Sequence, residues 1–240
     1  MPSTFIGSLA LVLVPELSSN YYSGNFLTLK NNVEKAVKFS VFTACLIIPV
    51  FLSAGEAIGS IIYADRAAGI YVKKGAITML PMSITIITTS ILNSLNKEKQ
   101  SLLYYLSGAT ALVLSIVFLP KYLGVDSLIL GMILSYSVTA VLNLRAVNKV
   151  CPKSPDTASY IVRAAAFVLP GCLAGYFANN LFLPGAGEFF AATISSVISL
   201  GVPLILFYVF GMLDFDGKNQ PSVRRERTRF STGKKAKRSA

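Results

Sequence analysis

Residues Leu102 to Arg145 are the clearest indication of the fold class; they read LLYYLSGATALVLSIVFL, then PKYLGVDS, then LILGMILSYSVTAVLNLR. Neither apolar run contains a charged side chain before Arg145. At about 1.5 Å of rise per residue, each run is long enough to cross most of a hydrocarbon core about 30 Å thick. In the connector, Pro120 stops the first helix and Gly124 turns the chain. The stretch therefore predicts a helical hairpin in a membrane.

The composition extends this prediction to the whole chain. Its 240 residues are 53% hydrophobic and 14% charged, with a mean hydropathy of +0.61, whereas soluble domains carry about 25% charged residues. The uninterrupted apolar blocks favour helices, because the strands of a membrane barrel would alternate in hydrophobicity. We therefore predict an all-α, polytopic transmembrane helix bundle. Its seven spans are expected at residues 3–15, 36–54, 75–95, 102–119, 127–145, 159–179 and 189–213.

The first of these spans is shorter than a membrane requires. Its apolar run ends at Pro15 and Glu16, so we expect it to lack its beginning and the chain to be the C-terminal part of a larger protein. Residues 17–35 are predicted to form a polar loop, with an amphipathic surface helix at 26–37. Residues 55–74 carry charges of both signs and are predicted to form another loop.

The net charge of +11 predicts the orientation. Residues 218–240 hold nine of the 22 Lys and Arg, so residues 214–240 are expected to form a basic tail that follows the membrane lobe of residues 1–213. Basic segments beside a span usually remain in the cytoplasm. We therefore expect a multi-pass protein of the cytoplasmic membrane, with its C-terminus and the loops at 16–35, 96–101 and 146–158 inside. Nucleic-acid binding is the alternative explanation of the tail, but no folded reader domain accompanies it.

Two predicted spans carry polar stripes. In the third span the polar residues lie on one helical face, and in the fifth they recur every four residues and so drift by about 40° per step around the helix. Such stripes either pack helices through small residues and hydroxyls or line a hydrated path for a polar substrate. The candidates for such a path are Thr85, Thr89, Asn93, Ser135, Tyr136, Thr139 and Asn143.

Other features favour packing and transport over catalysis. Gly171 and Gly175 form a GxxxG motif that predicts close helix packing, and prolines in four spans are typical of the bent helices of transporters. No Asp or Glu is expected deep in a span. The chain has no histidine and three isolated cysteines, which gives no support to a metal, a cofactor or a disulfide framework and argues against an enzyme.

Several segments together resemble the multidrug/oligosaccharidyl-lipid/polysaccharide (MOP) exporter superfamily. These are LVPELS at residues 13–18, YYSGN at 21–25, ILNSLNK at 91–97 and FLPKYLG at 118–124. The similarity covers about residues 1–212, and it is greatest to the polysaccharide-biosynthesis and stage V sporulation protein B group, which is related to lipid II flippases.

The resemblance implies one half of a two-lobe transporter of 14 helices. The chain would supply the last seven helices, and its partners would be membrane lipids, a lipid-linked sugar and a separate N-terminal lobe. The implied function is the flipping of a lipid-linked oligosaccharide, polysaccharide or peptidoglycan precursor by alternating access. The alternatives are a cation-coupled multidrug antiporter of the MATE branch and a membrane scaffold that transports nothing.

Overall fold

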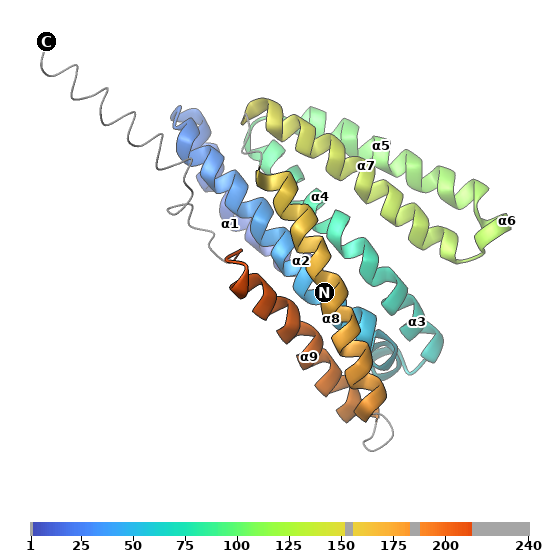
Figure 1. Ribbon diagram of the computed structural model, residues 1–240. Helices are drawn as coiled ribbons and strands as arrows, with labels where there is room; N and C mark the ends of the chain where they lie inside the picture. The colour runs from blue at the N-terminus through green and yellow to red at the C-terminus, as the bar shows by residue number, and fades with distance from the viewer. Residues whose placement is uncertain (1, 152–155, 183–187, 213–240) are drawn as a thin grey trace, which may run out of the picture.

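The computed structural model describes residues 2–151, 156–182 and 188–212, and within them the chain forms helices and no strands (Figure 1). Six stretches among these residues are long and apolar enough to cross a membrane. The protein is therefore an all-α, multi-pass helix bundle, as predicted. The helices are α1 Pro2–Tyr22, α2 Phe26–Tyr63, α3 Arg66–Gly75, the 3₁₀ turn η1 Ala76–Thr78, α4 Met79–Ser94, α5 Glu98–Phe118, α6 Pro120–Leu123, α7 Asp126–Val150, α8 Asp156–Phe182 and α9 Glu188–Val209.

Helix α2 is the centre of the bundle. It packs against α1, α3, α4, α8 and α9, while α7 packs on α4, and α5 packs mainly on α7 (Figure 1). Phe207 of α9 is fully buried, with its ring centroid 4.9 Å from that of Phe42 in α2 and 5.3 Å from that of Phe167 in α8. The α8–α9 pair and the α5–α7 pair are thus joined through the core formed by α2 and α4.

Consecutive long helices run in opposite directions, so their junctions gather at two ends of the bundle. Glu16 of α1 accepts a hydrogen bond from Asn32 of α2, and Tyr160 near the start of α8 lies beside Met212 after α9. We call this the α1–α2 end; it also holds the α4–α5 junction. Lys73 of α3 contacts Glu56 of α2 at the opposite end, the α2–α3 end. This arrangement is consistent with the predicted grouping of loops, but residues 152–155 and the basic tail at 214–240 lie outside the described residues, and the membrane side that each end faces stays a prediction.

The prediction of a polar loop at residues 17–35 is wrong except at residues 23–25, whereas the helix predicted at 26–37 is present as the start of α2. Helix α1 continues through Pro15 to Tyr22, and α2 begins at Phe26 after a turn in which Gly24 has a φ of +69°. Leu29, Val33 and Val37 are buried and continue the apolar face of the span. Because the apolar face is continuous, residues 26–37 and the predicted span at 36–54 form one uninterrupted helix. The 38 residues of α2 would extend for about 57 Å, well beyond one hydrocarbon core.

The mixed-charge loop expected at residues 55–74 is also helical. Helix α2 runs to Tyr63, and Asp65 caps α3 by accepting a hydrogen bond of 2.9 Å from the backbone N–H of Ala67. The two helices touch backbone to backbone, since a Cβ added to Gly59 would lie 2.2 Å from the Cα of Gly69. The signal for this contact was a second GxxxG motif, Gly55 to Gly59, which the sequence analysis assigned to the loop.

The predicted packing role of Gly171 and Gly175 is confirmed. A Cβ on Gly171 would meet Pro203 of α9 and Pro49 of α2 at 2.6 and 3.0 Å. One turn later, Gly175 leaves room for a hydrogen bond of 2.7 Å between the hydroxyls of Ser53 and Ser199. Small residues thus bring α2, α8 and α9 together along one line, as close packing in a membrane requires.

The predicted hairpin is formed by α5 and α7. Gly124 turns the chain with a φ of +55°, directly after the short helix that begins at Pro120. Along the contact, a Cβ on Gly108 would lie 2.1 Å from Oγ1 of Thr139, and a Cβ on Gly131 would lie 3.0 Å from Cβ of Ser115. The hairpin therefore closes through small residues, and it presents its large apolar side chains outward.

We predict that Gly59→Ala destabilises the bundle even though alanine is the better helix former. The added methyl group has no space against the backbone of Gly69, and such overpacking costs about 1–3 kcal/mol. The measurement is the apparent Tm of the purified protein in detergent. Gly201→Ala in α9 is the matched control, because a Cβ there meets nothing within 4 Å, and its Tm should stay equal or rise. Equal Tm values for both variants would contradict the close α2–α3 contact.

Candidate functional site

The contact between α4 and α7 is polar in the middle of an apolar bundle. The hydroxyl of Thr85 donates a hydrogen bond of 3.0 Å to the backbone carbonyl of Tyr136. One turn further along α4, the hydroxyl of Thr89 accepts a hydrogen bond of 3.0 Å from the amide of Asn143. We call the contact between these four residues the α4–α7 seam.

Asn143 is the residue in the seam whose hydrogen bonding is incomplete. Its side chain is fully buried, and its amide oxygen has no hydrogen-bond partner. Leaving a buried polar atom unpaired costs about 1–3 kcal/mol, so such atoms usually mark a place that water or a ligand reaches. The oxygen can accept a hydrogen bond from a hydroxyl or a water molecule that enters between α4 and α7.

The polar stripe of α7 contacts two neighbouring helices, α5 and α4, because it winds around α7 as predicted. Thr139 donates a hydrogen bond of 2.9 Å to the carbonyl of Ser135, and its hydroxyl lies against Gly108 of α5. Three steps of four residues separate Gly131 from Asn143, and they accumulate a rotation of about 120°. The earlier part of the stripe therefore faces α5, whereas Asn143 faces α4.

The seven predicted path residues are thus only partly brought together. Thr85, Thr89 and Asn143 meet in the seam, while Ser135 and Thr139 belong to the α5–α7 contact. Tyr136 joins the seam through its backbone, and its side chain is half-buried; Asn93 is exposed on α4 near the α1–α2 end. Helix packing accounts for the buried members in this conformation, and their role in a substrate path stays a prediction.

The sequence analysis missed a buried ion pair. Glu34 and Lys38 are one turn apart in α2, their charged atoms lie 2.6 Å apart, and their side chains are only 14% and 12% exposed. The ammonium group of Lys38 also lies 5.5 Å from the centre of the Tyr160 ring in α8, close enough for a cation–π interaction. Glu34 precedes the span predicted at residues 36–54, so the expectation that no Asp or Glu lies deep in a span stays a prediction, although this carboxylate is nearly buried in the bundle. The signal was the i, i+4 spacing of Glu and Lys within an apolar face, which was assigned to a surface helix.

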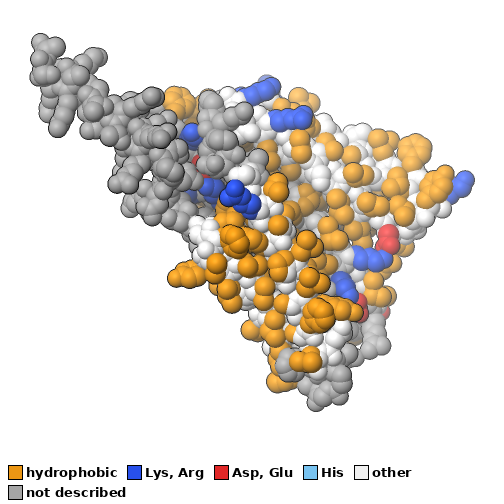
Figure 2. All heavy atoms as spheres, in the orientation of Figure 1, with side chains coloured by type: hydrophobic (Ala, Val, Ile, Leu, Met, Phe, Trp, Pro, Cys, Tyr) orange, Lys and Arg blue, Asp and Glu red, His pale blue; other side chains and the backbone are white. Residues whose placement is uncertain are grey.

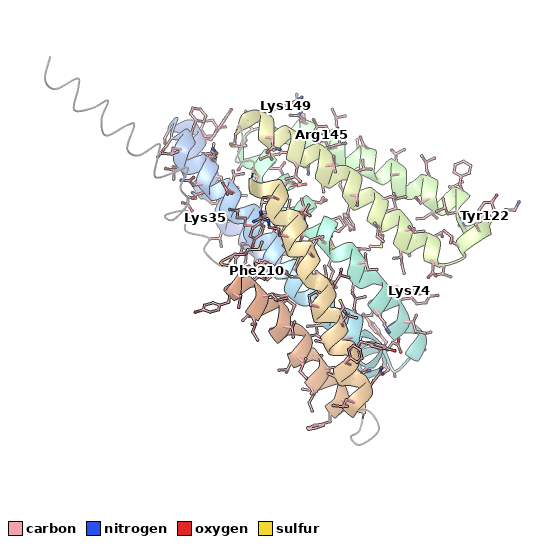
Figure 3. The ribbon with its side chains drawn as sticks, in the orientation of Figure 1. Lys35, Lys74, Tyr122, Arg145, Lys149 and Phe210 are labelled. Atoms are coloured by element: carbon pink, nitrogen blue, oxygen red, sulfur yellow. The ribbon has the colours of Figure 1, made fainter. Side chains whose placement is uncertain are left out.

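Two further ion pairs fasten the α2–α3 end. Lys73 bonds Glu56 at 2.8 Å and joins α3 to α2. Lys74 reaches both carboxylate oxygens of Asp126 at 2.7 Å and joins α3 to the start of α7 (Figure 3). All four side chains are 39–57% exposed, so each pair is weak. The Lys74–Asp126 pair helps to position the α5–α7 hairpin, because it is a second attachment of α7 to the rest of the bundle, separate from the α4–α7 seam.

The chain between the two attachments of α7 includes the 3₁₀ turn η1. Helix α3 passes into α4 through η1, and Pro81 lies in the first turn of α4. Because proline has no N–H, it cannot bond the carbonyl four residues earlier, at Ile77 within η1. Residues 67–94 nevertheless form one candidate membrane span. Pro81 and η1 thus lie between the Lys74–Asp126 ion pair and the α4–α7 seam.

Comparisons with known proteins add no relative: no family model, no curated protein and no solved structure matches the chain.

We predict that Thr89→Val destabilises the protein and that adding Asn143→Leu restores part of the loss. Valine at position 89 removes the acceptor of the Asn143 amide, so that both the nitrogen and the oxygen of this buried side chain are unpaired. Leucine at position 143 removes both polar atoms. A double-mutant cycle of Tm or unfolding free energy in detergent should give a coupling of about 0.6 to 1.7 kcal/mol, the range of hydrogen bonds between membrane helices. Additive effects of the two substitutions would contradict the Thr89–Asn143 bond.

Proposed function

We propose that the chain is one lobe of an alternating-access flippase for a lipid-linked oligosaccharide or a related polysaccharide or peptidoglycan precursor. It would act in the cytoplasmic membrane, with its C-terminus inside and with a second lobe as partner. The multi-pass helix bundle is consistent with this role. The observation that carries the proposal is the α4–α7 seam, with its buried and unpaired amide oxygen on Asn143.

The seam has the chemistry of a surface that is hydrated in another conformation. Helices in lipid can pack closely through small residues, as α2, α8 and α9 do around Gly171 and Gly175, where a single hydrogen bond joins the hydroxyls of Ser53 and Ser199. The α4–α7 contact instead offers two threonine hydroxyls and an amide. Sugar hydroxyls bond these groups well, because each sugar hydroxyl both donates and accepts.

The attachments of the hairpin indicate where movement would occur. The α5–α7 hairpin is held internally by close small-residue contacts, and it meets the rest of the bundle through α4, η1 and the exposed Lys74–Asp126 pair. Separation of α7 from α4 breaks weak polar bonds and leaves the hairpin intact. In this proposal the hairpin moves as a unit and exposes Thr85, Thr89 and Asn143 to the substrate.

The test is protection of the seam by substrate. In a background with Cys45, Cys151 and Cys172 replaced by alanine, Asn143→Cys is reconstituted in vesicles and reacted with a membrane-impermeant thiosulfonate. We expect slow labelling, and a several-fold slower rate when a polyprenyl-diphosphate-linked oligosaccharide is present. Ile87→Cys, at a buried apolar position of α4, is the control that should not react.

The alternatives give different results in the same assay. Protection of residue 143 by a lipophilic cation, without protection by the lipid-linked saccharide, would favour a multidrug antiporter over a flippase. Labelling that no ligand changes would favour a scaffold, and complete absence of labelling at residue 143 would show that the seam never hydrates. Each of these outcomes overturns the proposal.

We further predict that Asp126→Asn speeds the labelling of Asn143→Cys. The substitution removes the ion pair with Lys74, and an exposed pair contributes up to about 1 kcal/mol, so the rate should rise by up to about fivefold. Lys73→Gln is the matched control, because it breaks an ion pair that does not touch α7. An equal effect of both variants would indicate general loosening of the bundle in place of hairpin movement.

A further inference from the structure

The cations at the two ends of the bundle are arranged differently. At the α2–α3 end, Lys73 and Lys74 are both paired with carboxylates. At the α1–α2 end, Arg145 and Lys149 are exposed on α7, and neither makes an ion pair with an acidic residue that the structure describes. They lie one turn apart near the end of α7 (Figure 3). Because these two cations have no acidic partner among the described residues, their charge is available to an anionic ligand.

The antiparallel register of the hairpin brings more positive charge to the same level. Because Gly108 packs on Thr139 and the carbonyl of Tyr104 lies 3.4 Å from the Thr139 hydroxyl, the start of α5 lies beside the end of α7. That start carries Lys97 and Lys99 with one acidic residue, Glu98. The sum of these charges leaves this end of the hairpin positive.

An apolar stripe leads directly to the two cations. Leu134, Val138 and Val141 are 44%, 36% and 47% exposed, and their spacing of four and three residues continues by four to Arg145 and then Lys149. From Leu134 to Arg145 the helix rises about 16 Å, which is close to half of a hydrocarbon core of about 30 Å. Hydrophobic side chains also cover much of the visible face of the hairpin (Figure 2). The apolar stripe matches the acyl chain of a phospholipid, and the two cations match its phosphate headgroup.

We propose that this end of α7 is a binding site for an anionic phospholipid of the surrounding leaflet. The phosphate bonds the guanidinium of Arg145, whose planar donors suit phosphate oxygens, and the ammonium of Lys149. One acyl chain lies along Val141, Val138 and Leu134. Basic clusters at the cytoplasmic ends of membrane helices recognise anionic headgroups in this way, at about 1 kcal/mol per cation. The proposal does not depend on the flippase function.

The experiment measures lipid retention by the full-length protein in detergent micelles. Native mass spectrometry compares dioleoyl phosphatidylglycerol with dioleoyl phosphatidylcholine for the unaltered chain, Arg145→Gln, Lys149→Gln and the double variant. We expect the preference for phosphatidylglycerol to fall about fivefold for each cation removed. The basic segment at 218–240 is the same in every variant, so its contribution cancels from the comparison.

Lys121→Gln is the matched control, because Lys121 is an exposed cation at the opposite end of the same hairpin. Its phosphatidylglycerol preference should stay unchanged, and the Tm of all variants without added lipid should be equal. A preference that survives in the double variant, or falls equally in Lys121→Gln, overturns the site. Displacement of the lipid by millimolar inorganic phosphate, or by a lipid-linked saccharide in preference to phosphatidylglycerol, overturns the assignment to a phospholipid.

Discussion

The structure depends on one constraint, which is that helices in lipid gain almost nothing from hiding apolar surface from one another. Lipid tails are as apolar as leucine, so contacts between membrane helices must come from close packing and from hydrogen bonds. Both solutions are present in this chain. Glycines bring α2 against α3 and α8 against α9 until backbones or prolines touch, while hydroxyls and an amide join α4 to α7. Large side chains such as Leu173 and Val197 remain on the outside.

The two kinds of contact have different mechanical consequences. A glycine contact loses its dispersion energy steeply as the helices separate, because dispersion falls off over less than an ångström. A hydroxyl or amide can exchange its helix partner for water or a ligand hydroxyl at little cost. The bundle therefore has a tightly packed part around α2, α8 and α9, and a polar boundary at which the α5–α7 hairpin meets α4. The unpaired oxygen of Asn143 lies at that boundary.

The apolar surroundings of the helices also determine where charged side chains lie. The ionised groups of α3 and of the start of α7 are paired near an end of the bundle, where both members are partly exposed. Glu34 and Lys38 are instead nearly buried; their charged atoms lie 2.6 Å apart, and the ammonium group lies 5.5 Å from the centre of the Tyr160 ring. The exposed cations at the end of α7 have no such partner among the described residues, which leaves their charge for the lipid surface.

Features that depend on neighbouring residues could be predicted from the amino-acid sequence alone. Long uncharged runs predicted the membrane helices, Pro120 and Gly124 predicted the hairpin, and the spacing of Gly171 and Gly175 predicted a close contact. The order of spans along the chain also predicted which junctions share an end, since consecutive crossings must alternate.

The pairing of helix faces, in contrast, could not be predicted before the packing of the whole bundle was known. Helical spacing placed Gly131 and Asn143 on one stripe, but the drift of about 120° between them directs them to different partners, and the partner of Asn143 lies 54 residues away in the chain. Likewise, the polarity of residues 17–35 indicated a loop, whereas burial of Leu29 and Val33 against distant helices made them part of α2. Rotation and long-range packing are properties of helix pairs, and for that reason no single segment specified them.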